Sequence, residues 1–270
     1  MKPKFIAFLL SGFLLVLASC EDSDNTTIDP TDNLVHIGTE NDNGITLDLY
    51  SDAELHVGLN TLYFQLTDDN LGVNITEARI TQQPVMNMDG MKHSCPVTDP
   101  DVMANADGLF TGEVVFIMAS GMMGTWDDTL VVINESSGQT HKLVFSGLTV
   151  TETMMKKDLV FFDADSNQTS YIVTLNGLEN PQAGTNDIIL TVHHKESMMN
   201  IPEVGGLDIV MNPLMPDMGH GSTGNINPVY DGNGQYSGVV VFNMTGYWTI
   251  DFTFAENGDT LGTVQYEINF

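Results

Sequence analysis

The chain has 270 residues, of which 42% are hydrophobic, so it can form one large domain or two ordinary ones with packed cores. It has 8 Lys and Arg against 36 Asp and Glu, which gives a formal net charge of −28. This charge argues against nucleic-acid binding and against docking on anionic lipid headgroups, because few cations are present to neutralise phosphates. The acidic residues indicate a well-solvated surface, and an alternative role for them is to gather cations.

The first nineteen residues are typical of a bacterial lipoprotein signal peptide. Lys2 and Lys4 precede an apolar run of 14 residues, 5–18, which is shorter than the ~20 residues of a membrane-spanning helix. The run ends in Leu-Ala-Ser-Cys20, which resembles a lipobox, so we expect cleavage before Cys20 and acylation of this residue. The acidic stretch at 21–24 resembles the surface-export signal of lipoproteins in Bacteroidetes-type bacteria. We therefore expect a cell-envelope protein that its N-terminal lipid holds on the outer membrane, either facing the periplasm or surface-exposed.

The rest of the chain has the pattern of short β-strands. Residues 20–33, rich in Asp, Asn, Thr and Pro, predict an acylated Cys followed by a flexible linker. After it come segments that alternate or are rich in β-branched and aromatic residues, bounded by Gly, Asn and Asp: 45–50, 61–66, 114–118, 129–133 and 143–150. No long segment has a helical period. The pattern predicts an all-β protein built from sandwiches.

Recurring residues indicate an internal duplication. Gly58 and Gly184 are 126 residues apart, and the same spacing separates Phe116 from Phe242. The spacing of 126 residues also separates Asn60 from Asn186, Gly112 from Gly238 and Met118 from Met244, and Trp126 and Trp248 follow at a spacing of 122. We therefore predict two tandem immunoglobulin-like β-sandwich domains, residues 34–152 and 155–270.

Each predicted domain carries the pattern Met-x-x-Met-x-His. The second copy has Met215, Met218 and His220, and the first has Met88, Met91 and His93 at an offset of 127 residues. Thioether sulfur is a soft ligand that favours Cu(I), and imidazole also binds copper. The neighbouring Pro, Gly and Asp residues are typical of turns, although methionine is also a common core residue. The sequence predicts a soft-metal site in each loop, with the second copy as the stronger candidate.

Five further residues are candidate additional ligands. Met118 and Met244 each end a predicted strand before a glycine, although core packing is the simpler interpretation of both. The others flank the two loops: Met86, Cys95 and Met211. Cys95 has no disulfide partner if Cys20 is acylated, so it is either buried and inert or a thiolate ligand.

The second copy resembles YtkA-like domains, which are related in style to FixH and CopC-type copper proteins. The resemblance rests on the Met-Pro-x-Met-x-His-Gly loop, followed by 234–238 and by 242–248 with its Phe-Asn-Met-Thr-Gly-Tyr-Trp sequence. It implies an extracytoplasmic β-sandwich linked to copper handling, with Met215, Met218 and His220 as ligands. The first copy departs from the pattern at Asp89 and Ser94, which replace the Pro and the Gly.

Together these features predict a lipid-anchored protein that buffers, delivers or sequesters Cu(I), with a copper enzyme or an efflux system as the expected partner. No Gly-x-Ser-x-Gly, His-Glu-x-x-His or phosphate-binding loop is present, so we expect no enzymatic activity. The alternative is a surface immunoglobulin-like module for adhesion or scaffolding, in which methionines make apolar contacts. A polysaccharide-binding lipoprotein is a third option, which the 8% aromatic content disfavours.

Overall fold

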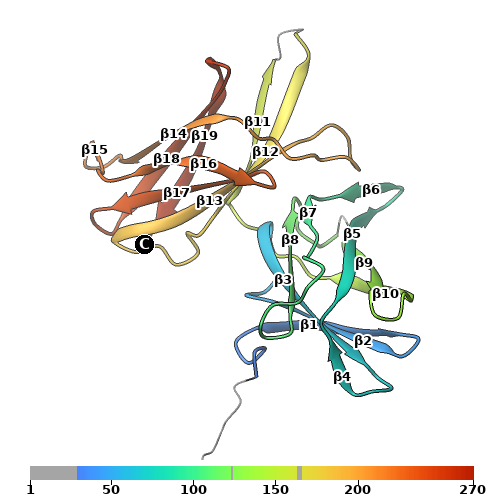
Figure 1. Ribbon diagram of the computed structural model, residues 1–270. Helices are drawn as coiled ribbons and strands as arrows, with labels where there is room; N and C mark the ends of the chain where they lie inside the picture. Colours follow the sequence, from blue (N-terminus) through green and yellow to red (C-terminus); the bar gives the residue numbers. More distant parts are fainter. Residues whose placement is uncertain (1–28, 123, 163–165) are drawn as a thin grey trace, which may run out of the picture.

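The computed structural model describes residues 29–270 except residue 123 and residues 163–165. The predicted signal peptide, Cys20 and most of the predicted linker lie outside the described residues. Every regular element within the described part is a β-strand, and this part contains no helix able to cross a membrane. The predicted all-β class is confirmed, and Figure 1 shows the strands gathered into two sandwich-like units.

Two sheets form the first unit. One has the order β1-β2-β3-β8-β7 with β4 paired to β3, and the other has the order β10-β9-β5-β6. The bounds are β1 Val35–Asp42, β2 Ile45–Ser51, β3 Gly58–Asp68, β4 Val73–Ile75, β5 Ala78–Met88, β6 Met91–Ser94, β7 Val97–Thr98, β8 Phe110–Phe116, β9 Thr125–Asn134 and β10 Thr140–Leu148.

Two further sheets form the second unit. One has the order β11-β12-β13-β17-β16 and the other β15-β14-β18-β19. The bounds are β11 Lys156–Phe162, β12 Gln168–Asn176, β13 Gly184–His194, β14 Asp208–Met215, β15 His220–Gly221, β16 Ile226–Gly232, β17 Gln235–Phe242, β18 Tyr247–Glu256 and β19 Asp259–Asn269.

The alternation of the sequence explains both cores. In β2 and β3 every second side chain is buried while those between are partly exposed, as expected for strands with one face on a core. One cluster of buried residues fills the first unit around Trp126, and another fills the second unit around Trp248. Phe116 lies 5.1 Å from Trp126 between ring centroids, and Phe242 lies 5.2 Å from Trp248.

The same local structure recurs before β3 and before β13. The Asn60 amide donates to the carbonyls of His56 and Gly58, and its Oδ1 accepts from His56 N. Asn186 makes the equivalent three bonds with Gln182 and Gly184. Both glycines have φ values that a side chain disfavours, 121° and 115°. The recurring residues of the sequence therefore sit in recurring structure.

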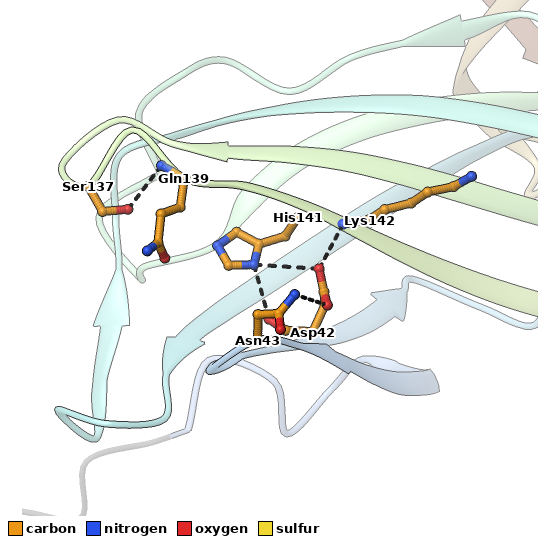
Figure 2. Close-up of polar contacts among 6 residues, drawn as sticks. All are labelled: Asp42, Asn43, Ser137, Gln139, His141 and Lys142. Atoms are coloured by element: carbon orange, nitrogen blue, oxygen red, sulfur yellow. Dashed lines mark hydrogen bonds and ion pairs between the residues drawn. The ribbon is translucent and has the colours of Figure 1, made fainter.

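A buried histidine ties the two sheets of the first unit together (Figure 2). The His141 side chain on β10 is 2% exposed, and its Nδ1 lies 3.0 Å from the backbone oxygen of Asp42 at the end of β1. The Asp42 carboxylate accepts bonds from Lys142 N at 3.2 Å and from the Asn43 amide at 2.6 Å. One carboxylate and one imidazole thus join the β1–β2 turn to the facing sheet.

We expect His141→Ala to lower the free energy of unfolding by about 2–3 kcal/mol, because it leaves a cavity and removes the bond to Asp42. Gln139 directly precedes the same strand, and its side chain is exposed. Gln139→Ala should therefore change the free energy of unfolding by less than about 0.5 kcal/mol. Urea unfolding of both variants measures the difference. Equal stabilities would contradict this role of His141.

The first core also contains a buried carboxyl group, and the described residues of the second core include none. Asp128 on β9 is 2% exposed and accepts a bond from Gln83 N at 3.0 Å. Burial raises the pKa of Asp128 to about 7, and this outweighs the bond from Gln83, which lowers it. Ile250, two residues after Trp248, stands where Asp128 stands two residues after Trp126. The two cores therefore differ in polarity directly beside the tryptophan.

The raised pKa of Asp128 makes the stability of the first unit depend on pH. Since folding favours the protonated carboxyl, the stabilisation is complete below pH ~4 and is lost as the pH rises through about 7. Relative to Asp128→Asn, the wild type should lose on the order of 4 kcal/mol between pH 4 and pH 8. Urea unfolding of both proteins across this range tests the expectation, and parallel stability curves would contradict it.

Candidate metal centre

A short hairpin at one edge of the second unit brings Met215 and His220 together. They are direct partners across the antiparallel pair of β14 and β15, so their side chains lie on the same face. The turn between them is closed by bonds from Met218 N and Gly219 N to the Met215 oxygen, at 3.2 and 2.9 Å. Gly219 has a φ of 65°, which a glycine adopts without strain. The predicted loop is thus a tight turn that fixes its first and last candidate ligands.

The His220 ring is oriented as in a metal-binding histidine. Its Nδ1 lies 3.0 Å from the Gly221 carbonyl oxygen, which can only accept, so Nδ1 carries the proton. Nε2 then keeps its lone pair, the arrangement that a ligating histidine has when a carbonyl holds its other nitrogen. The ring stands edge-on to Trp248 at 6.2 Å between centroids.

The three candidate methionines of this sheet edge differ in burial. Met215 is 5% exposed, and its methyl group lies so close to Gly246 that a Cβ there would be 2.9 Å away. Met218, in the turn, is 61% exposed, and Met244 is 40% exposed. Met244 lies two residues beyond the end of β17, and its carbonyl accepts a bond from Trp248 Nε1 at 3.1 Å. The edge therefore combines a buried thioether, a half-exposed imidazole and two exposed thioethers.

Met211 does not belong to this group. It lies four residues before Met215 on β14, roughly 13 Å away at the rise of a strand, and packs in the core opposite Phe252. Its 6% exposure and its apolar surroundings match a core methionine.

The first unit has the same hairpin at its sheet edge, but its histidine does not face the methionine that the sequence pattern predicts. His93 pairs with Met86 across β5 and β6, and Met86 also pairs with Trp126 across β5 and β9. Met86 is therefore the structural equivalent of Met215, and the sequence pairing of Met88 with Met215 is corrected. The cause is hairpin length: six residues separate Met86 from His93, whereas four separate Met215 from His220.

The two extra residues place Met88 and Met91 at the tip of the first hairpin. They pair with each other across the Asp89-Gly90 turn, with Met88 half-buried and Met91 46% exposed. Met88 Cγ lies against Gly124, where a Cβ would be 3.1 Å away. Met118 is partly buried two residues beyond β8, and its carbonyl accepts a bond from Trp126 Nε1 at 2.9 Å, as Met244 does in the second unit.

Cys95 lies inside the first core, two residues after His93. It is 5% exposed, and burial, with the nearby charge of Asp128, raises the pKa of its thiol well above the usual range. A neutral thiol is a poor metal ligand and a poor nucleophile, so this setting favours the inert alternative over the thiolate one.

The available donors are soft. No three His, Cys, Asp or Glu side chains come close enough to hold a metal in the described ranges, so a metal at either hairpin would rest on thioether sulfur and one imidazole. Such a donor set fits Cu(I) and does not fit hard cations such as Ca²⁺ or Mg²⁺, which need several oxygens.

Fold and hairpins together define a β-sandwich protein with a methionine and a histidine paired at one sheet edge of each unit. Residues 165–253, which include the second hairpin and Met244, match the model of the YtkA-like family. The resemblance predicted for the second copy is confirmed.

Other comparisons add little. No curated protein matches the chain. Similar solved structures include a conserved domain protein from Bacillus anthracis, with 11% identity, 87% of this chain and 90% of that chain covered, and a TM-score of 0.35. They also include the adhesin InvE of Yersinia pseudotuberculosis, with 13% identity, 80% and 56% covered, and a TM-score of 0.23. TM-scores this low bear on neither fold nor function.

We expect Cys95 to resist thiol reagents in the folded protein. In a chain that begins at residue 21 it is the single cysteine, so labelling by iodoacetamide reports on it alone. Labelling at pH 8 should be slower than in 6 M urea by more than about 100-fold, because the thiol must be exposed and deprotonated to react. Similar rates in the two conditions would contradict the burial.

Proposed function

We propose that the chain is an extracytoplasmic protein that binds Cu(I) at the Met215–His220 hairpin and buffers, delivers or sequesters it. The observation that carries the proposal is the cross-strand pair itself, in which a buried thioether faces an imidazole whose Nδ1–H is bound to a carbonyl. Nε2 is then left to coordinate. Strands hold both groups, so binding requires little ordering of the chain.

Exposed methionines complete the proposed site. Met218 lies in the turn between the pair, and Met244 follows β17 beside Trp248. Their exposure, 61% and 40%, leaves both thioethers free to move onto an arriving ion and to pass it on. Soft, uncharged donors select Cu(I) by polarisability.

The setting of this binding is also part of the proposal. We propose that acylated Cys20 anchors the chain in the cell envelope, on the outer membrane, and that the Asp- and Asn-rich linker separates the lipid from the sandwiches. A copper enzyme or an efflux system is the expected recipient of the ion. The chain then acts by binding and transfer, with no catalytic step.

Cu(I) titration of residues 21–270 against bicinchoninic acid, under anaerobic reducing conditions, tests the proposal. Met218→Ala/His220→Ala should weaken binding to the second unit by more than about tenfold, since even outer partners of metal ligands contribute this much. Met154→Ala is the matched control, because Met154 is 75% exposed and belongs to neither hairpin.

A wild-type protein that takes no Cu(I) from the chelator, or that binds it equally well in the double variant, would overturn the proposal. In that case the surface adhesion or scaffold module becomes the better account of the exposed methionines.

A further inference from the structure

His93 is buried without a partner for one of its nitrogens. Its side chain is 9% exposed, and its Nδ1 is shielded from solvent and has no hydrogen-bond partner. A buried polar atom without a partner costs free energy unless something binds to it. The facing residue is Met86, which is fully buried, so the nearest partner across the strands offers a thioether.

A row of thioethers leads from this histidine to solvent. Met86 and Met88 are two residues apart on β5, and Met91 and His93 are two residues apart on β6, so all four side chains lie on one face. The Met88–Met91 pair follows the Met86–His93 pair toward solvent and lies at the hairpin tip, where Met91 is 46% exposed. Soft donors therefore line the way inward.

The second unit closes the other edge of this hairpin. β6 is the outer strand of its sheet, and Ser94 N donates to the Met198 oxygen of the second unit at 2.9 Å. The segment 195–202 that presents this oxygen is anchored, because Ile201 is buried in the core of the first unit. Ser197 Oγ further accepts bonds from Met199 N and Asn200 N.

Neighbouring contacts hold the two units in this position. Leu59 N donates to the Asn176 side chain at 3.0 Å, and the Gln235 amide donates to the Glu113 carboxylate at 2.6 Å. Ile172 of β12 also joins the first core. Opening β6 away from β5 therefore requires breaking a contact between the units.

The second hairpin lacks this closure. β15 has two residues, it is the outer strand of its sheet, and no hydrogen bond joins it to the first unit in the described part of the chain. His220 is half-exposed, and the turn beside it is short.

We propose that the first unit holds a second Cu(I) site, of a closed type, with Met86 sulfur and His93 Nδ1 as ligands and with slow exchange because the second unit holds β6 shut. This inference rests on the proposed function. The second-unit site is the open, fast-exchanging one. A single chain thus carries a retained ion and an exchangeable ion.

The rate at which Cu(I) passes from the protein to a chelator tests whether the two sites exchange at different rates. Residues 21–270 loaded with two equivalents of Cu(I) are mixed with excess bicinchoninic acid, and the coloured complex is followed in time. We expect two phases that differ by at least tenfold in rate. His220→Ala should remove the fast phase and His93→Ala the slow one, and retention of the fast phase shows that His93→Ala still folds.

Ser94→Pro tests the closure itself. It removes the Ser94 N–H that donates to the Met198 oxygen, and proline is tolerated on an outer strand. Since it also removes the bond from Ser94 Oγ to the Pro84 oxygen, its rate is compared with that of Ser94→Ala, which loses only the side-chain bond. Loss of about 1 kcal/mol from the closed state should speed the slow phase about fivefold. Lys92→Pro is the matched control, two residues away on the same outer edge, and should leave the rate within about twofold of wild type.

The outcomes separate the two proposals. If wild type holds no Cu(I), the proposed function fails and this inference with it. If it holds one ion that depends on His220 alone, or two ions that leave in one phase, this inference is overturned and the proposed function stands. A slow phase that Ser94→Pro leaves unchanged overturns the closure by the second unit.

Discussion

Antiparallel register beside a buried tryptophan is the constraint on which both hairpins depend. In each unit a methionine at the end of a core strand faces a histidine on the outer strand, Met86 with His93 and Met215 with His220. The tryptophan of the neighbouring core strand donates its indole N–H to the carbonyl of a methionine in the loop before that strand, Trp126 to Met118 and Trp248 to Met244. Because a buried indole N–H needs an acceptor, this bond fixes the loop against the hairpin. The strand pairing and one indole hydrogen bond therefore position the methionine and histidine side chains, so the length of the turn between them can differ.

The two units differ in the length of the hairpin turn and in one core residue near the tryptophan. The turn is two residues longer in the first unit, which moves its second and third methionines, Met88 and Met91, out to the tip, and His93 in this unit is buried. Beneath the tryptophan, Asp128 replaces the apolar residue that the second unit has at Ile250, and its carboxyl is protonated more readily than in water. Two units with the same strand pairing thus give a histidine that is buried in the first unit and half-exposed in the second. Under the proposed function, this is the difference between storing an ion and exchanging it.

Much of the strand pattern could be predicted because burial alternates with sequence. The segments predicted at 45–50, 61–66, 129–133 and 143–150 all lie within observed strands or overlap them, since β-branched and aromatic residues alternate there. The segment predicted at 114–118 extends beyond β8, which ends at Phe116, because the chain turns there to bring the Met118 carbonyl to Trp126. The boundaries predicted for the two domains stay predictions, although the strands form two separate cores.

The candidate site was harder to predict than the fold. A shared Met-x-x-Met-x-His spacing suggested that Met88 corresponds to Met215, but equivalence in a hairpin is set by register, and register depends on turn length. The sequence pattern therefore ranks Met86 as an additional ligand only, although it occupies the position facing His93. The bond from Ser94 to Met198 joins residues about a hundred positions apart through backbone atoms, which no side-chain pattern encodes. Sequence patterns thus identify donor types, while pairing and closure require the fold.

The net charge of the surface and the soft donor atoms of the hairpins act on cations at different ranges. A net charge of −28 draws cations of every kind toward the surface, and this long-range attraction does not distinguish copper from calcium or magnesium. Selection has to come from the donors that the cation meets at short range. The described residues offer no cluster of three carboxylate, thiol or imidazole groups, whereas both hairpins offer uncharged sulfur beside one imidazole. Under the proposed function, hard cations remain in the diffuse layer around the acidic surface, whereas Cu(I) gains free energy by leaving this layer for the sulfur and imidazole of the hairpin.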